Sequence, residues 1–187
     1  MESVAGLDRR GFLGLGIATS LILAAAGLSA SLSGCSGKLQ TAQGLRFLRE
    51  ADVSLLRALL PALLAGLLPA DAAARKLQLD ATLQRFDSMC ARLGIPNQKA
   101  LRDLFDLLNG ALTRRLAAGV AKSWAEVSPA EAEAFLERWR SSSVSLFNAG
   151  YRGLNKLASV SYLGLPQTWP LSGYAGPLDY VFRAANT

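Results

Sequence analysis

The chain has 187 residues, a formal net charge of +6 and 51% hydrophobic residues, and it contains no histidine. The lack of histidine excludes Ser-His-Asp and Cys-His catalytic arrangements, c-type haem attachment and most zinc and non-haem iron sites. No glycine-rich nucleotide-binding pattern occurs, and although a pair of carboxylates can form a hydrolase site, no feature of the sequence argues for one. The composition therefore favours a domain that is not itself an enzyme.

The first 34 residues have the features of an export signal. Arg9 and Arg10 precede Phe12 and Leu13, and no further charged residue follows until Lys38. Positive charges before an apolar run fix the orientation of such a segment in the membrane, and this order of residues resembles the twin-arginine signal. The alternative is an uncleaved transmembrane helix, since about 20 apolar residues cross a bilayer. The glycines and serines within the run favour the signal.

The apolar run ends in Leu32-Ser33-Gly34-Cys35, which resembles the lipobox of a bacterial lipoprotein. Cleavage before Cys35 makes it the first residue of the mature chain, with lipid on its thiol and commonly an acyl group on its amine. Two or more acyl chains anchor a protein stably, whereas one gives only marginal binding. We therefore expect a periplasmic protein held to a membrane by lipid on Cys35, with the inner or outer membrane left open.

The mature part of the chain fits one domain behind a short tether. Residues 35–44 are small and polar, which predicts a lipidated tether, and residues 45–187 are long enough to bury a core of their own. The two basic and two acidic residues of 1–34 cancel, so the net charge of +6 belongs to the exported part. Its cations are scattered, and with export this argues against nucleic acid and fits mild attraction to anionic lipid headgroups.

Apolar residues at helical spacing predict two helices at the start of this domain. The first begins near Asp52, is kinked at Pro61 and ends near Pro69. The second covers residues 72–93 and places Cys90 on its apolar face. If Cys35 carries lipid, Cys90 has no partner for a disulfide, and its position favours a buried, unreactive thiol.

Three more helices are predicted in the rest of the domain. One runs from a cap at Asn97 to about Gly119. Ser128 and Glu131 form a capping box with a proline between them, so a fourth helix begins there. After a run of three serines the helical period continues to about Leu163. No segment alternates with period two, so the expected fold class is all-α, an irregular bundle of about five helices.

The last 23 residues are rich in proline, glycine and aromatic side chains. Their prolines and glycines exclude a regular helix, which predicts an extended tail. Trp169, Tyr174, Tyr180 and Phe182 are too apolar for a solvated tail. Two alternatives remain open: the tail packs on its own bundle, which needs no partner and is favoured slightly, or it lies on another protein.

Several segments between residues 131 and 177 carry a resemblance to a known family. They are Phe135-Leu136-Glu137-Arg138-Trp139-Arg140, Tyr151-Arg152-Gly153-Leu154-Asn155-Lys156-Leu157, Tyr162-Leu163-Gly164, Trp169 and Gly173-Tyr174-Ala175-Gly176-Pro177. Their order resembles the C-terminal half of the small subunit of gluconate 2-dehydrogenase-like enzymes, often called subunit 3. The leucine-rich opening with Pro61 and Pro69 is similar to that family more loosely.

The resemblance implies a non-catalytic role. Members of the family accompany a GMC-type flavin dehydrogenase, which oxidises an alcohol or a sugar in the periplasm and passes electrons to a cytochrome c. The FAD is then expected in the large partner subunit and no cofactor in this chain. In several such systems the small subunit carries the only export signal and escorts the folded, flavin-loaded partner. The lipobox of this chain is a departure from many relatives.

Four aromatic residues are the candidate partner-binding residues: Trp139, Tyr151, Trp169 and Tyr174. We expect them to form or brace the surface that holds the flavoprotein. Trp139 and Tyr151 fit core positions of a helix equally well, so Trp169 and Tyr174 are the better interface candidates. The alternative function is a free-standing periplasmic lipoprotein that binds a lipid or an apolar ligand among its leucines, which ordinary helical cores also resemble.

Overall fold

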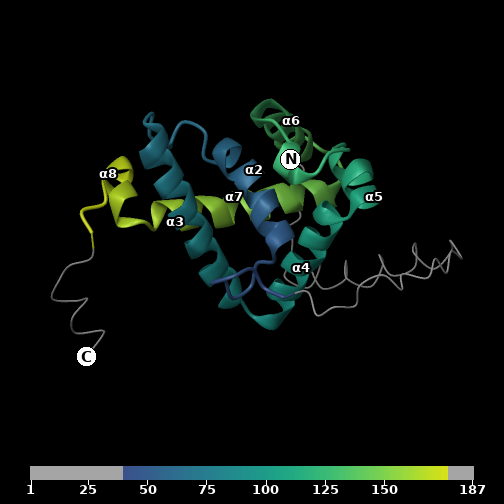
Figure 1. Cartoon of the computed structure of the whole chain (residues 1–187), viewed down its shortest axis with the longest axis horizontal. Helices are drawn as coiled ribbons and strands as arrows, with labels where there is room; N and C mark the ends of the chain where they lie inside the picture. The colour runs from purple at the N-terminus through teal and green to yellow at the C-terminus, as the bar shows by residue number, and fades with distance from the viewer. Residues whose placement is uncertain (1–39, 177–187) are drawn as a thin grey trace, which may run out of the picture. The chain divides into compact units, whose positions relative to one another are not determined.

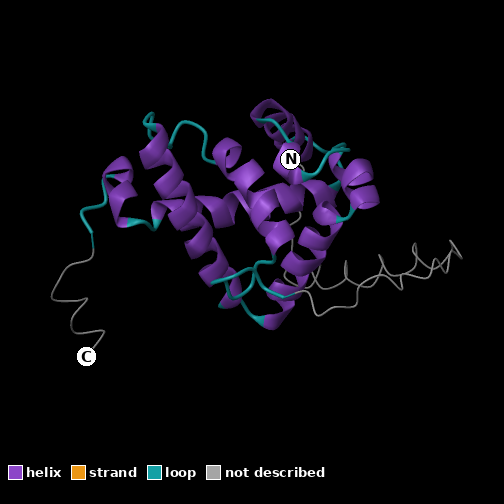
Figure 2. Ribbon diagram, viewed as in Figure 1, coloured by secondary structure: helices purple, strands orange, loops and turns teal. Residues whose placement is uncertain are grey.

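The computed structural model describes residues 40–176. The chain divides into two units, Met1–Lys38 and Leu39–Thr187, and the described residues all belong to the second. Every regular element among them is helical, as Figure 2 shows, so the predicted all-α class is confirmed. There are seven α-helices in this part of the chain. Five are long and correspond to the five predicted helices, whereas α5 (Ala111–Thr113) and α8 (Trp169–Ser172) are short additions.

Helix α2 (Glu50–Leu63) is the central helix of the bundle. It packs against α3 (Ala72–Ala91), α4 (Ile95–Asn109), α6 (Pro129–Arg140) and α7 (Ser145–Leu163), and α7 also packs along α3 and α6. Figure 1 shows α7 running across the domain behind α2. The fully buried side chains come from every long helix and from the segment before α2: Leu48, Leu55, Leu56, Leu59, Leu60, Leu64, Phe86, Phe105, Leu108, Phe135, Trp139 and Tyr162.

Three predicted helix boundaries differ from the structure. The first helix ends at Leu63, before Pro69, because Leu64 leaves the helical conformation (φ −107°, ψ 18°) and Gly66 takes a left-handed one (φ +81°). The predicted cap at Asn97 is wrong: Gly94 is the N-cap of α4, and the proline at position 96 fits the first turn, where its missing N–H costs nothing.

The third predicted helix is not continuous to Gly119. Helix α4 ends at Asn109, because Gly110 takes an extended conformation (φ −62°, ψ 129°) that stops the helical hydrogen bonds. The chain then forms α5 and the π-helical segment Arg114–Ala118, which ends at Gly119 in a left-handed conformation. The helical period of the leucines therefore spans a break that the apolar pattern alone does not reveal.

The capping box of α6 is confirmed. The Ser128 hydroxyl accepts a hydrogen bond from the Glu131 amide, and the Glu131 carboxylate accepts one from the Ser128 amide at 2.9 Å. The hydrogen bond from the Ser128 amide, with those that Lys122 and the Ser128 hydroxyl also donate to this carboxylate, lowers the pKa of Glu131 to about 2. The predicted break after α6 also holds, since α6 ends at Arg140 and α7 begins at Ser145.

Candidate functional site

The residues predicted to direct export and lipidation lie outside the described part of the chain. They are Arg9, Arg10, Phe12, Leu13 and Cys35. Their roles, and the alternative of a transmembrane helix at residues 11–34, therefore stay predictions. Within residues 40–176 no helix is both long and apolar enough to cross a bilayer.

Trp139 lies in the core of the domain. Its side chain is 2% exposed, its indole Nε1 donates a hydrogen bond to the Ala117 carbonyl at 2.9 Å, and its ring stacks on Phe147 with centroids 5.1 Å apart. The Phe135 ring also packs against this indole, with the ring centroids 4.9 Å apart. A buried indole with a satisfied N–H contributes to packing between α6 and α7. Trp139 can therefore brace a surface but does not itself form one.

Tyr151 is half-buried on α7 and packs against the edge of the core. It lines a shallow groove of about 270 Å³ between α2, α6 and α7, together with Leu63, Glu133 and Arg140. This groove is open and more polar than apolar at its surface. Tyr151 is thus accessible along one edge, unlike Trp139, although both come from the α6–α7 region.

Trp169 and Tyr174 form a unit of their own after α7. Their rings pack edge to face with centroids 5.2 Å apart, and the Tyr174 amide donates to the Trp169 carbonyl at 3.1 Å. Gly176 has φ +99°, and a Cβ there would lie 2.8 Å from Cζ3 of Trp169, so the indole closes against bare backbone. We call residues 169–176 the C-terminal clamp. Tyr174 remains 51% exposed on it.

The clamp adjoins the bundle through the turn that precedes it. Leu165 and Thr168 are buried, and the Thr168 hydroxyl donates to the Tyr162 and Leu165 carbonyls at the end of α7. Helix α8 in turn packs mainly against this turn, Pro166–Thr168. The prediction that no regular helix forms here is wrong for Trp169–Ser172, because Pro170 lies in the first turn, where proline is tolerated.

The four predicted aromatic residues therefore do not form one site. Trp169 and Tyr174 come together in the clamp, beyond the C-terminal end of α7, whereas Trp139 and Tyr151 pack where α6 meets the first half of α7. Tyr180 and Phe182 of the predicted tail lie outside the described residues.

A buried polar network, which the sequence analysis did not identify, joins α2 to α4. The Asp52 side chain is 1% exposed and accepts hydrogen bonds from Arg102 at 2.6 Å and from the Asn109 amide at 2.7 Å. Arg102 lies over the Phe47 ring, 4.3 Å from its centroid, and donates to the Phe47 carbonyl at 2.6 Å. The ion pair and the hydrogen bonds compensate for the cost of taking this carboxylate out of water.

A second buried carboxylate holds the chain as it enters the domain. Asp87 on α3 accepts the backbone amides of Arg46, Phe47 and Leu48, each at 2.8 Å. Further upstream Ala42, within the predicted tether, is buried and its amide donates to the Leu48 carbonyl at 2.8 Å. Ordered contacts with the domain therefore begin before residue 45.

One sequence signal could have revealed both carboxylates. Asp52 stands three residues before Leu55 on the apolar stripe of α2, and Asp87 follows the buried Phe86. A charged residue in register with an apolar face is rare unless it is paired inside the fold. Cys90 is on the same buried face of α3 as Phe86, and its predicted burial is confirmed; burial raises the pKa of its thiol to about 12.

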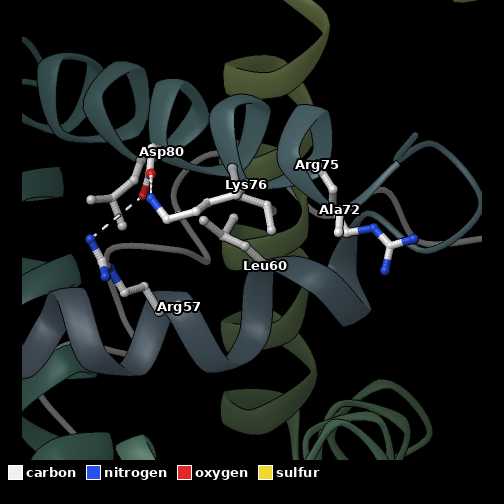
Figure 3. A pocket seen from close by; sticks show the side chains of 8 residues that line it. Arg57, Leu60, Ala72, Arg75, Lys76 and Asp80 are labelled. Carbon is white, nitrogen blue, oxygen red and sulfur yellow. Dashed lines mark hydrogen bonds and ion pairs between the residues drawn. The ribbon is translucent and has the colours of Figure 1, made fainter. Parts of the chain in front are cut away.

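A hollow of about 290 Å³ lies between α2 and α3, and Figure 3 shows it from close by. Its floor is apolar and includes Leu60, while Lys76 and Arg57 reach over it from opposite helices. Both cations meet Asp80, at 2.7 Å and 3.5 Å respectively. Arg75 points away from Asp80 and donates to the carbonyls of residues 69 and 70. An apolar floor below a mostly cationic rim suits a small amphipathic anion.

Residues 40–176 hold no group of three or more His, Cys, Asp or Glu side chains placed to bind a metal ion. Comparisons of the chain with family models, with curated proteins and with solved structures found no match. The resemblance to gluconate 2-dehydrogenase subunit 3 therefore rests on the motif residues alone and stays a prediction.

Proposed function

We propose that this chain is a non-catalytic small subunit that escorts, anchors and stabilises a periplasmic GMC-type flavin dehydrogenase. In this role the twin-arginine signal carries the assembled pair across the membrane, and lipid on Cys35 holds the pair there. The flavoprotein partner supplies the FAD and oxidises an alcohol or a sugar. A cytochrome c subunit is a further candidate partner as electron acceptor.

The C-terminal clamp is the observation that supports this role best. It contains the Trp169 and Gly-Tyr-x-Gly motif of the resemblance, and it presents Leu171 and Tyr174, 59% and 51% exposed, on one short segment. Tyrosine and tryptophan are enriched at protein interfaces, where a few aromatic anchors carry most of the binding energy. Of the motif residues, Tyr174 is therefore accessible to a partner, with the exposed Leu171 beside it in the chain.

The clamp is also held in shape before any partner arrives. Thr168 ties its base to α7, Tyr174 is hydrogen-bonded to the Trp169 carbonyl, and Gly176 closes it. Ordering loops and side chains on binding costs free energy, so a segment that is already ordered binds more tightly. The arrangement fits an anchor for a large folded partner.

Co-purification tests the subunit role directly. The lipoprotein is extracted from membranes of the native bacterium in mild detergent, and flavin absorbance near 450 nm is measured in the eluate. We expect a flavoprotein with the wild-type chain and about a tenfold lower yield with Trp169→Ala combined with Tyr174→Ala. Leu112→Ala is the matched control, since Leu112 is 70% exposed and outside the clamp, and it should retain the partner.

Two outcomes count against the proposal. A wild-type chain that elutes with no flavoprotein overturns the subunit role. If Arg9 and Arg10 are replaced by Lys, we expect the flavoprotein to remain in the cytoplasm together with this chain. Retention of this chain alone, with normal export of the flavoprotein, disproves the escort and leaves the lipoprotein signal intact.

The hollow between α2 and α3 favours the second candidate, a free-standing lipoprotein that binds a lipid or an apolar ligand. An acyl chain fits the apolar floor of the hollow. The fatty-acid carboxylate would pair with Arg57 and Lys76 in place of the Asp80 carboxylate that pairs with them now. Native mass spectrometry of the purified lipoprotein with added palmitate tests it. Binding that is lost in Ala72→Trp, which narrows the hollow, together with the lack of a protein partner would favour this function over the first.

A further inference from the structure

The turn between α3 and α4 presents the most exposed large apolar side chain in the described part of the chain. Ile95 is 83% exposed at the first position of α4. The turn is braced rather than loose, because the Gln98 side chain donates to the carbonyls of Ala91 and Leu93 at 3.0 and 2.9 Å. Solvent exposure of one isoleucine is ordinary on its own. Here it coincides with two further features.

The first feature is the charge around Ile95. Residues 88–102 include Arg92, Lys99 and Arg102 and no acidic residue. Arg102 is committed to the buried network, whereas Arg92 and Lys99 are exposed on either side of the turn. Lys99 pairs at 2.7 Å with Asp103, both largely exposed, and such pairs exchange readily with solvent. An isoleucine between exposed cations matches the chemistry of an anionic lipid surface.

The second feature is the path of the tether. Asp87, which binds the amides of Arg46, Phe47 and Leu48, lies four residues before the end of α3, about 6 Å along the helix. The chain therefore enters the domain beside the α3–α4 turn, and Figure 1 shows its first coloured segment between these ends of α3 and α4. This placement is fixed by a buried carboxylate rather than by surface contacts.

The tether leaves little slack between this entry and the lipid. The predicted lipid attachment site, Cys35, lies only five residues before the first described residue, Gln40. Five residues span at most about 17 Å when fully extended. A domain held so closely by its lipid meets the membrane first with the face where the tether enters.

We propose that the α3–α4 turn is a membrane-contact site, in which Ile95 enters the headgroup region of an anionic bilayer and Arg92 and Lys99 meet lipid phosphates. The inference rests on the proposed lipid anchor at Cys35. One isoleucine and two cations bind a bilayer weakly by themselves, but a lipid tether supplies a high effective concentration of membrane. The contact orients the domain, and Figure 1 shows α8 away from this turn, which leaves the clamp free for a protein.

Depth-dependent quenching tests the contact on the full lipoprotein. The chain is purified from membranes and reconstituted into vesicles of phosphatidylglycerol and phosphatidylethanolamine that contain brominated acyl chains. Ile95→Trp is compared with Leu112→Trp, an exposed leucine away from the turn, over the background of the three native tryptophans. We expect the added tryptophan at 95 to be quenched about twice as strongly as the one at 112.

The charges are tested by a second variant in the same vesicles. Arg92→Gln combined with Lys99→Gln should reduce the quenching at position 95, and so should neutral phosphatidylcholine vesicles. Equal quenching at positions 95 and 112 in anionic vesicles overturns the inference.

Failure of the anchor can be told apart from failure of the contact. If the purified chain carries no lipid, the proposed anchor is wrong. The mature chain is then coupled through Cys35 to a maleimide lipid. Cys90 does not compete for the maleimide, because it is buried and the pKa of its thiol is raised to about 12. Quenching at position 95 in that coupled chain decides the membrane contact by itself.

Discussion

The entry segment, residues 45–48, and the C-terminal clamp, residues 169–176, are both short stretches next to the bundle, but they are held by different means. Two buried carboxylates tie the entry segment into the core. Asp87 accepts its backbone amides, and Asp52 binds Arg102, which donates to the Phe47 carbonyl. The clamp instead closes on itself through an aromatic pair. From this difference we expect the entry segment to unfold with the bundle and the clamp to open by itself.

Removal of Asp52 should cause the largest loss in the free energy of unfolding. In Asp52→Ala, Arg102 and Asn109 lose a shared acceptor inside the fold, and breaking a buried pair in this way costs about 3–5 kcal/mol of the free energy of unfolding. Urea unfolding followed by circular dichroism at 222 nm measures the loss. Such a loss is a large share of the stability of a domain of this size.

Asp103→Ala is the matched control for this prediction. Asp103 also pairs with a cation at hydrogen-bonding distance, but both side chains are largely exposed, 62% and 75% for Asp103 and Lys99. An exposed pair is worth about 0.5 kcal/mol or less. Equal losses in the two variants would mean that the buried network does not hold the entry segment.

Asp87→Asn should have a smaller and more local effect. One carboxylate oxygen accepts the amides of Phe47 and Leu48, and the other accepts that of Arg46. Asparagine keeps one acceptor oxygen for the amides of Phe47 and Leu48. Its NH₂ group then faces the Arg46 amide, and because both are donors about 1–2 kcal/mol of stability is lost. Hydrogen exchange should rise first at the amide of residue 46.

The exposed cap of α3 provides the comparison. Asp71 accepts the amide of Ala74 at 2.7 Å, and asparagine caps a helix about as well as aspartate. Asp71→Asn should therefore leave unfolding and exchange at residues 46–48 unchanged. A loss of protection in that variant too would place the effect in α3 as a whole rather than at Asp87.

The long helices could be predicted because their signals are local. Leucines at helical spacing mark α2, and the capping box at Ser128 marks the start of α6. The break at Gly110 and the start of α4 at Ile95 could not, since both depend on how a glycine or a proline is accommodated in one turn. Residue type restricts those conformations without choosing among them.

The candidate site, like the helices, could be predicted from the sequence only in part. The sequence favoured Trp169 and Tyr174 over Trp139 and Tyr151 as interface residues, but only tertiary packing shows that Trp139 is 2% exposed and Tyr174 51% exposed. Asp52 and Asp87 were missed because the groups that pair with them across the fold are distant in the chain. Arg102 and Asn109 lie 50 and 57 residues from Asp52, and the amides bound by Asp87 lie 39–41 residues from it. A charge on an apolar stripe is visible in a sequence, but the group that pairs with it is not.

Opening the clamp should have the smallest effect on overall stability. In Gly176→Ala, the new Cβ would meet Cζ3 of Trp169 at 2.8 Å, and φ +99° disfavours any side chain. Because α8 packs mainly against the adjoining turn, Pro166–Thr168, the strain is relieved by local release of the clamp, and the free energy of unfolding should fall by less than about 1 kcal/mol.

The release should instead appear in the tryptophan spectrum and in partner binding. Acrylamide should quench more of the fluorescence in Gly176→Ala, because Trp169 loses its cover, and the yield of flavoprotein should fall with it. Tyr174→Phe keeps the edge-to-face packing and should leave the quenching unchanged. If Gly176→Ala unfolds the whole domain as readily as Asp52→Ala does, the clamp belongs to the folding unit after all. Its aromatic pair would then be core rather than a surface kept for another protein.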